Sequence, residues 1–218
     1  MQALSTWFQL FAFFTQTNVS GDNIEIMTGQ LLWASPDSIY IHIIEPVNQN
    51  VLLAGGKMLI YYPDEPKALE VSLNPNDPYA YLAIAPSVKP INEDLILAAG
   101  LIETQRTQKN DETHLQFRQK SQKNPYPIIN ITKNAEQITQ LNTIKAMSVY
   151  TNMDIHEYTT VNDEVFLKSY TTSDFSANKL TGETTVVFDT LYVPNKREIE
   201  SIVFTIPLWL DVEPIKFY

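Results

Sequence analysis

The sequence predicts a mainly β protein, in which one curved antiparallel sheet is covered by a few short α-helices. Apolar residues alternate with polar ones over most of the chain, which is typical of strands with one buried face. The alternating runs are short and are separated by turn residues, among them most of the six glycines and thirteen prolines. Only two segments have helical features. No linker and no repeat of fixed period divides the 218 residues, so we interpret residues 1–218 as a single domain.

The first helix is predicted over residues 3–13, where apolar residues recur at helical spacing. The members of this stripe are Leu4, Trp7, Phe8 and Phe11. A second helix is predicted over residues 92–100, because Asn92 is a typical capping residue, acidic residues follow it and Gly100 ends the pattern. Together these segments supply little helical cover for a long sheet.

The remaining apolar runs predict strands that end at Pro, Gly or Asn-rich turns. In the first part of the chain they cover residues 24–33, 39–44, 51–53, 58–62 and 67–73. After a Pro-rich stretch over 74–90, further strands are predicted at residues 101–108, 113–120, 126–132, 137–147, 149–160, 164–171, 184–191 and 199–206. Two structures agree with this pattern: a curved sheet that encloses an apolar cavity able to hold an acyl chain, and a packed sandwich without a cavity.

Charge and composition exclude several functions. The formal net charge of −10 and the pI near 4.7 argue against nucleic acid and against electrostatic docking on anionic lipid. The absence of cysteine excludes disulfides, thiolate nucleophiles and cysteine-ligated zinc. The first residues lack the features of a signal peptide, so we expect either a cytosolic protein or a mature exported chain that begins at Met1.

Motifs for catalysis are missing, and we predict neither an enzyme nor a cofactor. There is no Gly-x-Ser-x-Gly elbow and no glycine-rich phosphate loop. The one tight group of metal-capable residues is Asp154, His156 and Glu157. On a regular strand Glu157 would point away from the other two, so we interpret the group as a solvated polar strand and predict no metal site.

The first sixty residues resemble the periplasmic outer-membrane lipoprotein carriers of the LolA type. The matching pieces, in family order, are Phe14-Thr15-Gln16 at the end of the first helix, Gly29-Gln30-Leu31-Leu32-Trp33, Pro36, Pro46, Gly55-Gly56-Lys57 and Tyr61-Tyr62-Pro63. The second predicted helix is similar to the family's lid helix, and Phe204-Thr205-Ile206-Pro207 resembles a motif near its C-terminal strand. The resemblance implies an incomplete antiparallel barrel over an apolar cavity that is closed by helices.

The resemblance also implies a function: a periplasmic carrier, its signal peptide removed, that takes acylated lipoproteins from an inner-membrane ABC release complex to the outer membrane. An outer-membrane receptor would be a further partner, and we expect a monomer. The alternatives are a lipid or glycolipid shuttle or a lipoprotein sensor on the same fold, and a structural β-domain with a filled core.

For a carrier, we assign residues to a lid, a wall and a latch position. The lid residues are Trp7, Phe8 and Phe11 on the first helix and Leu95, Ile96 and Leu97 on the second. The wall residues of the acyl cavity are Ile39, Ile41, Ile43, Leu69 and Val71. The family's well-known members have an arginine latch just before the first turn proline. Ser35 stands there in this chain, so control of the lid must differ.

Overall fold

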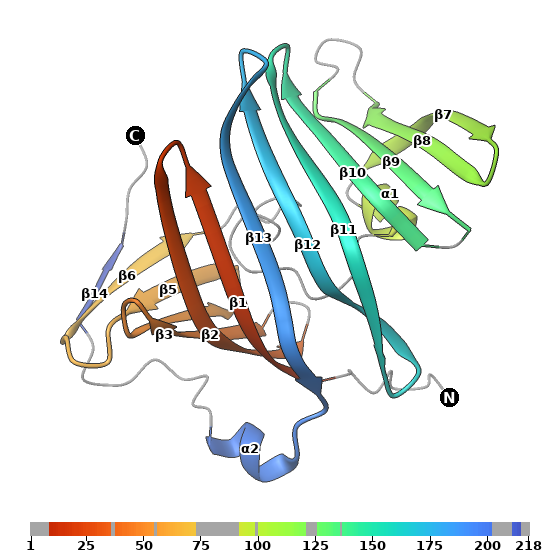
Figure 1. The fold of residues 1–218 in the computed structure, drawn as a ribbon. Coiled ribbons are helices and arrows are strands. Elements are labelled where there is room, and N and C mark those ends of the chain that lie inside the picture. The colour runs from red at the N-terminus through yellow and green to blue at the C-terminus, as the bar shows by residue number, and fades with distance from the viewer. Residues whose placement is uncertain are drawn as a thin grey trace. The chain divides into compact units, whose positions relative to one another are not determined.

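Strands make up most of the protein, as Figure 1 shows. The computed structural model describes residues 9–35, 38–54, 56–72, 92–98, 100–120, 126–135, 137–201 and 211–214. The first strands are β1 (Leu10–Ser20), β2 (Asn23–Ser35), β3 (Ser38–Glu45), β4 (Gln49–Ala54), β5 (Lys57–Tyr61) and β6 (Lys67–Ser72). They are followed by α1 (Glu93–Ala98), β7 (Leu101–Lys109), β8 (Glu112–Gln119), β9 (Ile128–Asn134), β10 (Gln137–Ala146) and β11 (Val149–Val161). The last elements are β12 (Glu164–Ser176), β13 (Lys179–Tyr192), α2 (Lys196–Ser201) and β14 (Asp211–Pro214).

The strands form one open sheet. Its order is β14-β6-β5-β4-β3-β2-β1-β13-β12-β11-β10-β9-β8-β7. The sheet is antiparallel, except that β14 runs parallel to β6. Because β14 and β7 are its two end strands, the sheet does not close within the described residues. The prediction of a mainly β fold with an open antiparallel sheet is therefore confirmed, while the apolar cavity stays a prediction.

The chain divides into two compact units. Unit 1 consists of Met1–Thr15, Ile26–Ala85 and Phe188–Tyr218, and unit 2 of Gln16–Glu25 and Pro86–Val187. The boundaries fall within β1, β2 and β13, so these three strands contribute residues to both units. The interpretation of residues 1–218 as a single domain stays a prediction.

In unit 1, the strands β2 to β6 are apolar on both faces of the sheet. Residues paired across antiparallel strands share a face, so the register assigns each side chain. One face, here called the tyrosine face, carries Tyr40 and a packed cluster of Leu52, Leu59, Tyr61 and Ala68. The other, here called the isoleucine face, carries Ile39, Ile41, Ile43, Val51, Leu53, Met58, Ile60, Leu69 and Val71.

In unit 2, one face of the sheet is apolar and the other is polar. The core face carries Leu115, Phe117, Ile129, Ile131, Leu141, Met153, Tyr170 and Val186, all buried. Helix α1 packs against this face, where Ile96 is buried and Glu93 accepts hydrogen bonds from Arg106 and Lys133. Both cations belong to the core face, since Arg106 pairs with Leu115 and Lys133 lies two residues from Ile131.

Most predicted elements are confirmed. The strands predicted between residues 24 and 73 and between 101 and 191 correspond to β2 to β13, and the helix predicted over 92–100 is α1. Within the described segments, no helix has the length and apolar character needed to cross a membrane.

Two predicted elements are wrong. Residues 10–13 belong to β1 and not to a helix, and Phe14-Thr15-Gln16 lies within that strand; residues 3–8 lie outside the described residues. The apolar run at the start of β1 is largely buried on both faces of the strand. A run of this kind occurs in central strands as well as in helices, so the spacing of its apolar residues did not distinguish the two. The strand predicted over 199–206 overlaps α2, and residues 202–206 lie outside the described residues.

Helix α2 has a capping box that the strand prediction overlooked. The Asn195 side-chain oxygen accepts hydrogen bonds from the backbone N–H groups of Arg197 and Glu198. The Glu198 carboxylate in turn accepts one from the Asn195 backbone N–H at 2.7 Å. This reciprocal pair satisfies N–H groups that would otherwise be unpaired in the first turn, and the sequence Asn195-Lys196-Arg197-Glu198 is its signal.

Candidate functional site

The isoleucine face brings all five predicted wall residues together in unit 1. Ile41 pairs with Val51, which pairs with Ile60, which pairs with Leu69. A second row, parallel to the first, consists of Ile39, Leu53, Met58 and Val71. Ile43 lies two residues beyond Ile41 on the same face. Four members of these rows were not predicted as wall residues, although the hairpin signals around residues 55 and 56 fix their register.

The rows are apolar throughout, and their exposure varies. Ile41, Val51, Leu53 and Val71 are buried, while Leu69 is 42% exposed. Ile39 and Ile43 are half-buried. The assignment of these side chains to the wall of an acyl cavity stays a prediction. No ionisable side chain occurs in either row. Removing water from an apolar surface of this kind costs little free energy, and the surface offers dispersion contacts to hydrocarbon. It offers no hydrogen-bond partner to a polar ligand, which would lose its own hydration on binding.

An aromatic ring covers one end of the isoleucine face. Gly29 pairs with Ile43, so its missing side chain would point to this face. A Cβ built there would lie 2.7 Å from the ring of Phe14 and 2.6 Å from the backbone oxygen of His42. The Phe14 ring of β1 therefore lies directly over Gly29, at a distance that only glycine permits.

The tyrosine face is a structural core. The Tyr40 hydroxyl donates a hydrogen bond to the side-chain oxygen of buried Asn50 at 2.7 Å. Burial, with a smaller contribution from Tyr61, raises the pKa of Tyr40 to about 12. Burial also raises the pKa of Tyr61. Both phenols are thus neutral at physiological pH. The isoleucine face, where Leu53 and Val51 are also buried, is the candidate site because its two rows hold no ionisable group.

The predicted lid residues lie in different places. Phe11 lies in β1, three residues from Phe14 and so on the opposite face, where its ring contacts Phe13 and Tyr192 at centroid distances of 5.3 Å. Its assignment to a lid helix is therefore wrong. Trp7 and Phe8 lie outside the described residues.

The remaining lid residues belong to α1 in unit 2. Ile96 is 4% exposed and Leu97 is 46% exposed, so one packs on the core face and the other faces solvent; Leu95 lies between Asp94 and Ile96 in the same helix. Their role as a lid stays a prediction.

The latch position Ser35 is the last residue of β2. It pairs with Ser38, the first residue of β3, across a register shift after Trp33. Pro36 and Asp37, which join the two strands, lie outside the described residues.

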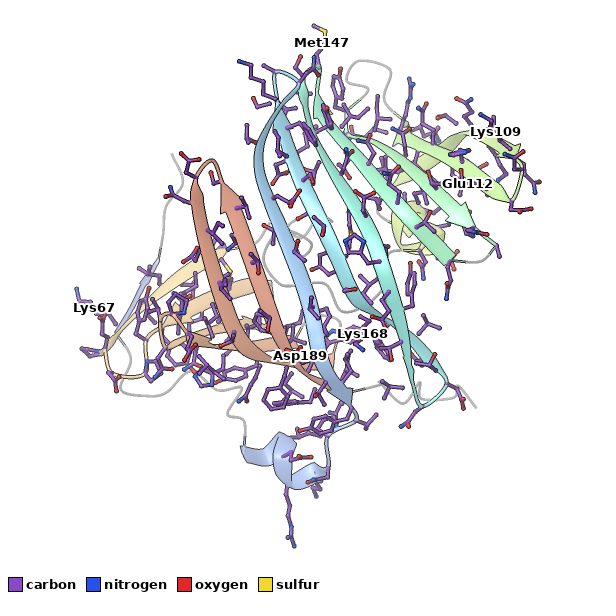
Figure 2. The ribbon with its side chains drawn as sticks, viewed as in Figure 1. Lys67, Lys109, Glu112, Met147, Lys168 and Asp189 are labelled. Atoms are coloured by element: carbon purple, nitrogen blue, oxygen red, sulfur yellow. The ribbon has the colours of Figure 1, made fainter. Side chains whose placement is uncertain are left out.

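The residues Asp154, His156 and Glu157 lie where β11 is irregular. Register shifts on both sides of Glu157 pair it with Ser169, while Asp154 pairs with Thr171. The expectation that Glu157 points to the other face stays a prediction. His156 shares a hydrogen bond of 2.8 Å with Thr171, Asp154 accepts one from Gln140 at 2.7 Å, and Glu157 lies 3.7 Å from Lys168, which is labelled in Figure 2. Over the ranges that the structure describes, no three such groups converge as they would around a metal ion.

Comparison with solved structures relates this arrangement to known folds. A LolA superfamily protein from Nitrosomonas europaea superimposes with a TM-score of 0.59 over 87% of this chain and 88% of its own, at 10% identity. The fold is LolA-like. A putative outer-membrane lipoprotein-sorting protein domain from Vibrio parahaemolyticus gives a TM-score of 0.59 at 7% identity, over 90% of this chain and 91% of its own. A protein of the DUF1329 family from Desulfovibrio piger gives 0.59 at 9% identity, over 88% of each chain.

No family model and no curated protein matches the sequence of this chain. The solved structures therefore show a similar fold only, and the proposed ligand is argued from the isoleucine face.

Proposed function

We propose that the protein is a periplasmic carrier that binds the acyl chains of lipoproteins on the isoleucine face. The single observation behind this proposal is that two rows of four apolar residues lie side by side on an open sheet, with no ionisable group among them. The LolA-like fold supports the proposal, because one of the similar structures is described as a lipoprotein-sorting domain.

The energetics of carriage suit a surface that is only partly exposed. Each CH₂ group removed from water contributes about 0.8 kcal/mol, so a fully enclosed pair of acyl chains would dissociate very slowly. On the isoleucine face an acyl chain competes with contacts that already bury Ile41 and Val71. That competition lowers the net affinity and permits release.

The proposed partners are those that the resemblance to LolA-type carriers implies. An inner-membrane ABC release complex supplies the lipoprotein, the outer membrane accepts it, and a receptor there is a further candidate.

Site-specific photo-cross-linking tests the proposal. A photoreactive phenylalanine in place of Leu69 should form a cross-link to a triacylated lipoprotein, because Leu69 is exposed on the isoleucine face. The matched control places the same group at Glu70, the neighbouring residue on the tyrosine face, where we expect no adduct. Equal capture at both positions, or none at Leu69, would contradict the proposal.

A further inference from the structure

Four amide side chains form a hydrogen-bonded row across β8 to β11 in unit 2. Gln116, Asn130, Asn142 and Asn152 lie directly opposite one another in the register, on the polar face that we call the amide face. The Gln116 amide donates to Asn130 at 3.0 Å, Asn130 donates to Asn142 at 3.1 Å, and Asn142 donates to Asn152. All four amides thus point in one direction. At the start of the row the Arg118 guanidinium donates to the Gln116 oxygen at 2.9 Å.

The composition of this row conflicts with strand propensity. Asparagine is depleted in strands because its side chain competes for backbone hydrogen bonds, and here three asparagines occupy strand interiors in register. Threonine, which is common on the solvent face of a sheet, has a higher strand propensity than asparagine. Sites that break a local rule in this way are often functional.

The row keeps hydrogen-bonding capacity to spare. A primary amide has two N–H donors and an oxygen that accepts twice, and each contact within the row uses one of each. In Asn130 and Asn142 one N–H and one lone pair are left unused, and both side chains are half-buried. The Gln116 oxygen already accepts two hydrogen bonds, from Arg118 and from Thr104, so Gln116 keeps only an N–H to spare. At the end of the row, the Asn152 nitrogen has no hydrogen-bond partner in the described part of the chain.

Neighbouring rows on the amide face add hydroxyl and aromatic groups. On one side, Thr171 shares hydrogen bonds with Thr185 at 3.0 Å and with His156 at 2.8 Å. On the other side, the rings of Tyr150 and Phe175 stack with their centroids 4.6 Å apart. The face therefore combines planar amides, hydroxyls and an apolar border at fixed positions on rigid strands.

We propose that the amide face binds a neutral oligosaccharide that lies across β8 to β11. The uncharged amides of Asn130 and Asn142, each with one unused donor and one unused acceptor, complement sugar hydroxyls, which both donate and accept. Three strand spacings give the row a length of ~14 Å, enough for several sugar units. A sheet face is a known platform for oligosaccharides in other folds. Acidic ligands are disfavoured, because Asp154 and Glu183 belong to the adjoining positions and the chain carries a net charge of −10. This inference does not depend on the acyl-binding proposal.

A glycan array followed by titration tests the inference on the full chain. The array carries neutral glucans, galactans and mannans together with anionic glycans, and we expect retention on at least one neutral class. Asn142→Ala should weaken binding to that glycan about tenfold, because it removes the central amide and its two contacts in the row. Asn134→Ala is the matched control, since Asn134 lies on the same face of β9 but outside the row, and its binding should stay unchanged.

A second variant separates binding from folding. Asn142→Asp keeps the size of the side chain but cannot donate to Asn152, so the protein should stay folded by circular dichroism and still bind about tenfold more weakly. Retention of anionic glycans only, retention of none, or equal binding by the wild type and both Asn142 variants would overturn the inference.

Discussion

At the scale of single residues, Gly29 and Gly182 show how closely the strands approach. Both lie in strands, and neither has a left-handed backbone. A Cβ at Gly29 would collide with the His42 backbone and the Phe14 ring, whereas the nearest atom to a Cβ at Gly182 is the Val19 oxygen at 3.7 Å, an ordinary contact. The two glycines therefore have different physical roles.

We expect Gly29→Ala to destabilise the protein by about 1–3 kcal/mol, because the backbone of His42 cannot move aside cheaply. Gly182→Ala should be neutral or stabilise by a few tenths of a kcal/mol, since alanine costs less chain entropy than glycine and meets no obstacle. Urea unfolding of both variants measures the difference. Equal stabilities would show that the β1–β2 region is looser than described.

At the scale of elements, α1 is fastened to the sheet by its first residue. Glu93 lies 2.8 Å from Lys133 on β9 and 2.9 Å from Arg106 on β7. The hydrogen bond from Lys133, then that from Arg106, lowers the pKa of Glu93 below its ordinary value of 4.5, against the effect of burial. A helix of six residues has little stability of its own, so this contact and buried Ile96 hold it in place.

Stability should depend on pH through Glu93. Its folded-state pKa is lowered, so its contribution is present above pH 4.5 and is lost as the pH falls below that value. Glu93→Gln should cost about 1 kcal/mol near pH 7 and progressively less at lower pH, as measured by urea unfolding over the acid range. Glu103→Gln, which loses an exposed contact with the same Arg106, should cost less at every pH. A Glu93→Gln penalty that is independent of pH would contradict this assignment.

The isoleucine face can be tested by an exposed substitution. Leu69→Asn should weaken the binding of a fluorescent fatty acid about fivefold, since it removes accessible apolar area from the proposed site, while the unfolding midpoint changes little. Leu180→Asn, at a similarly exposed leucine of β13 in unit 2, should leave dye binding unchanged. Equal losses in both variants would indicate nonspecific adsorption of the dye.

The sequence predicts these elements unevenly. Alternation and turn residues were enough for β2 to β13, and the capping pattern at Asn92 was enough for α1. The same signals failed at Leu10–Phe14, because burial on both faces of the strand removes the alternation of apolar and polar residues. They also failed at α2, because its capping box lies in a stretch that otherwise has the pattern of a strand. The wall residues could be predicted because they recur at every second position. The amide row could not, because register across four strands is a tertiary property.

At the scale of the whole molecule, three strands link the two units through the covalent chain. β1, β2 and β13 each begin in one unit and end in the other. Trp33 is the one tryptophan among the described residues, and it lies in the part of β2 that belongs to unit 1. The fluorescence of Trp33 therefore reports on unit 1, whereas far-ultraviolet circular dichroism reports on both units.

We expect fluorescence and circular dichroism to give the same unfolding midpoint in urea. A strand cannot lose its structure in one unit without exposing its neighbours in the other, so the transition should be cooperative. An earlier fluorescence transition would show that unit 1 unfolds alone, and would contradict the coupling through β1, β2 and β13.

The end strand β7 has a consequence for how the protein behaves at high concentration. A sheet that does not close leaves a row of backbone groups able to recruit another chain, which is a route to fibrils. Apart from Leu101, every residue of β7 is exposed, yet the strand has a bulge between Glu103 and Gln105, and Arg106 forms an ion pair with Glu103 at 2.7 Å. A foreign strand would have to match that irregularity and strip water from those charges. The bulge and the ion pair therefore make β7 a poor template for pairing with a strand of another chain, which disfavours aggregation through this edge.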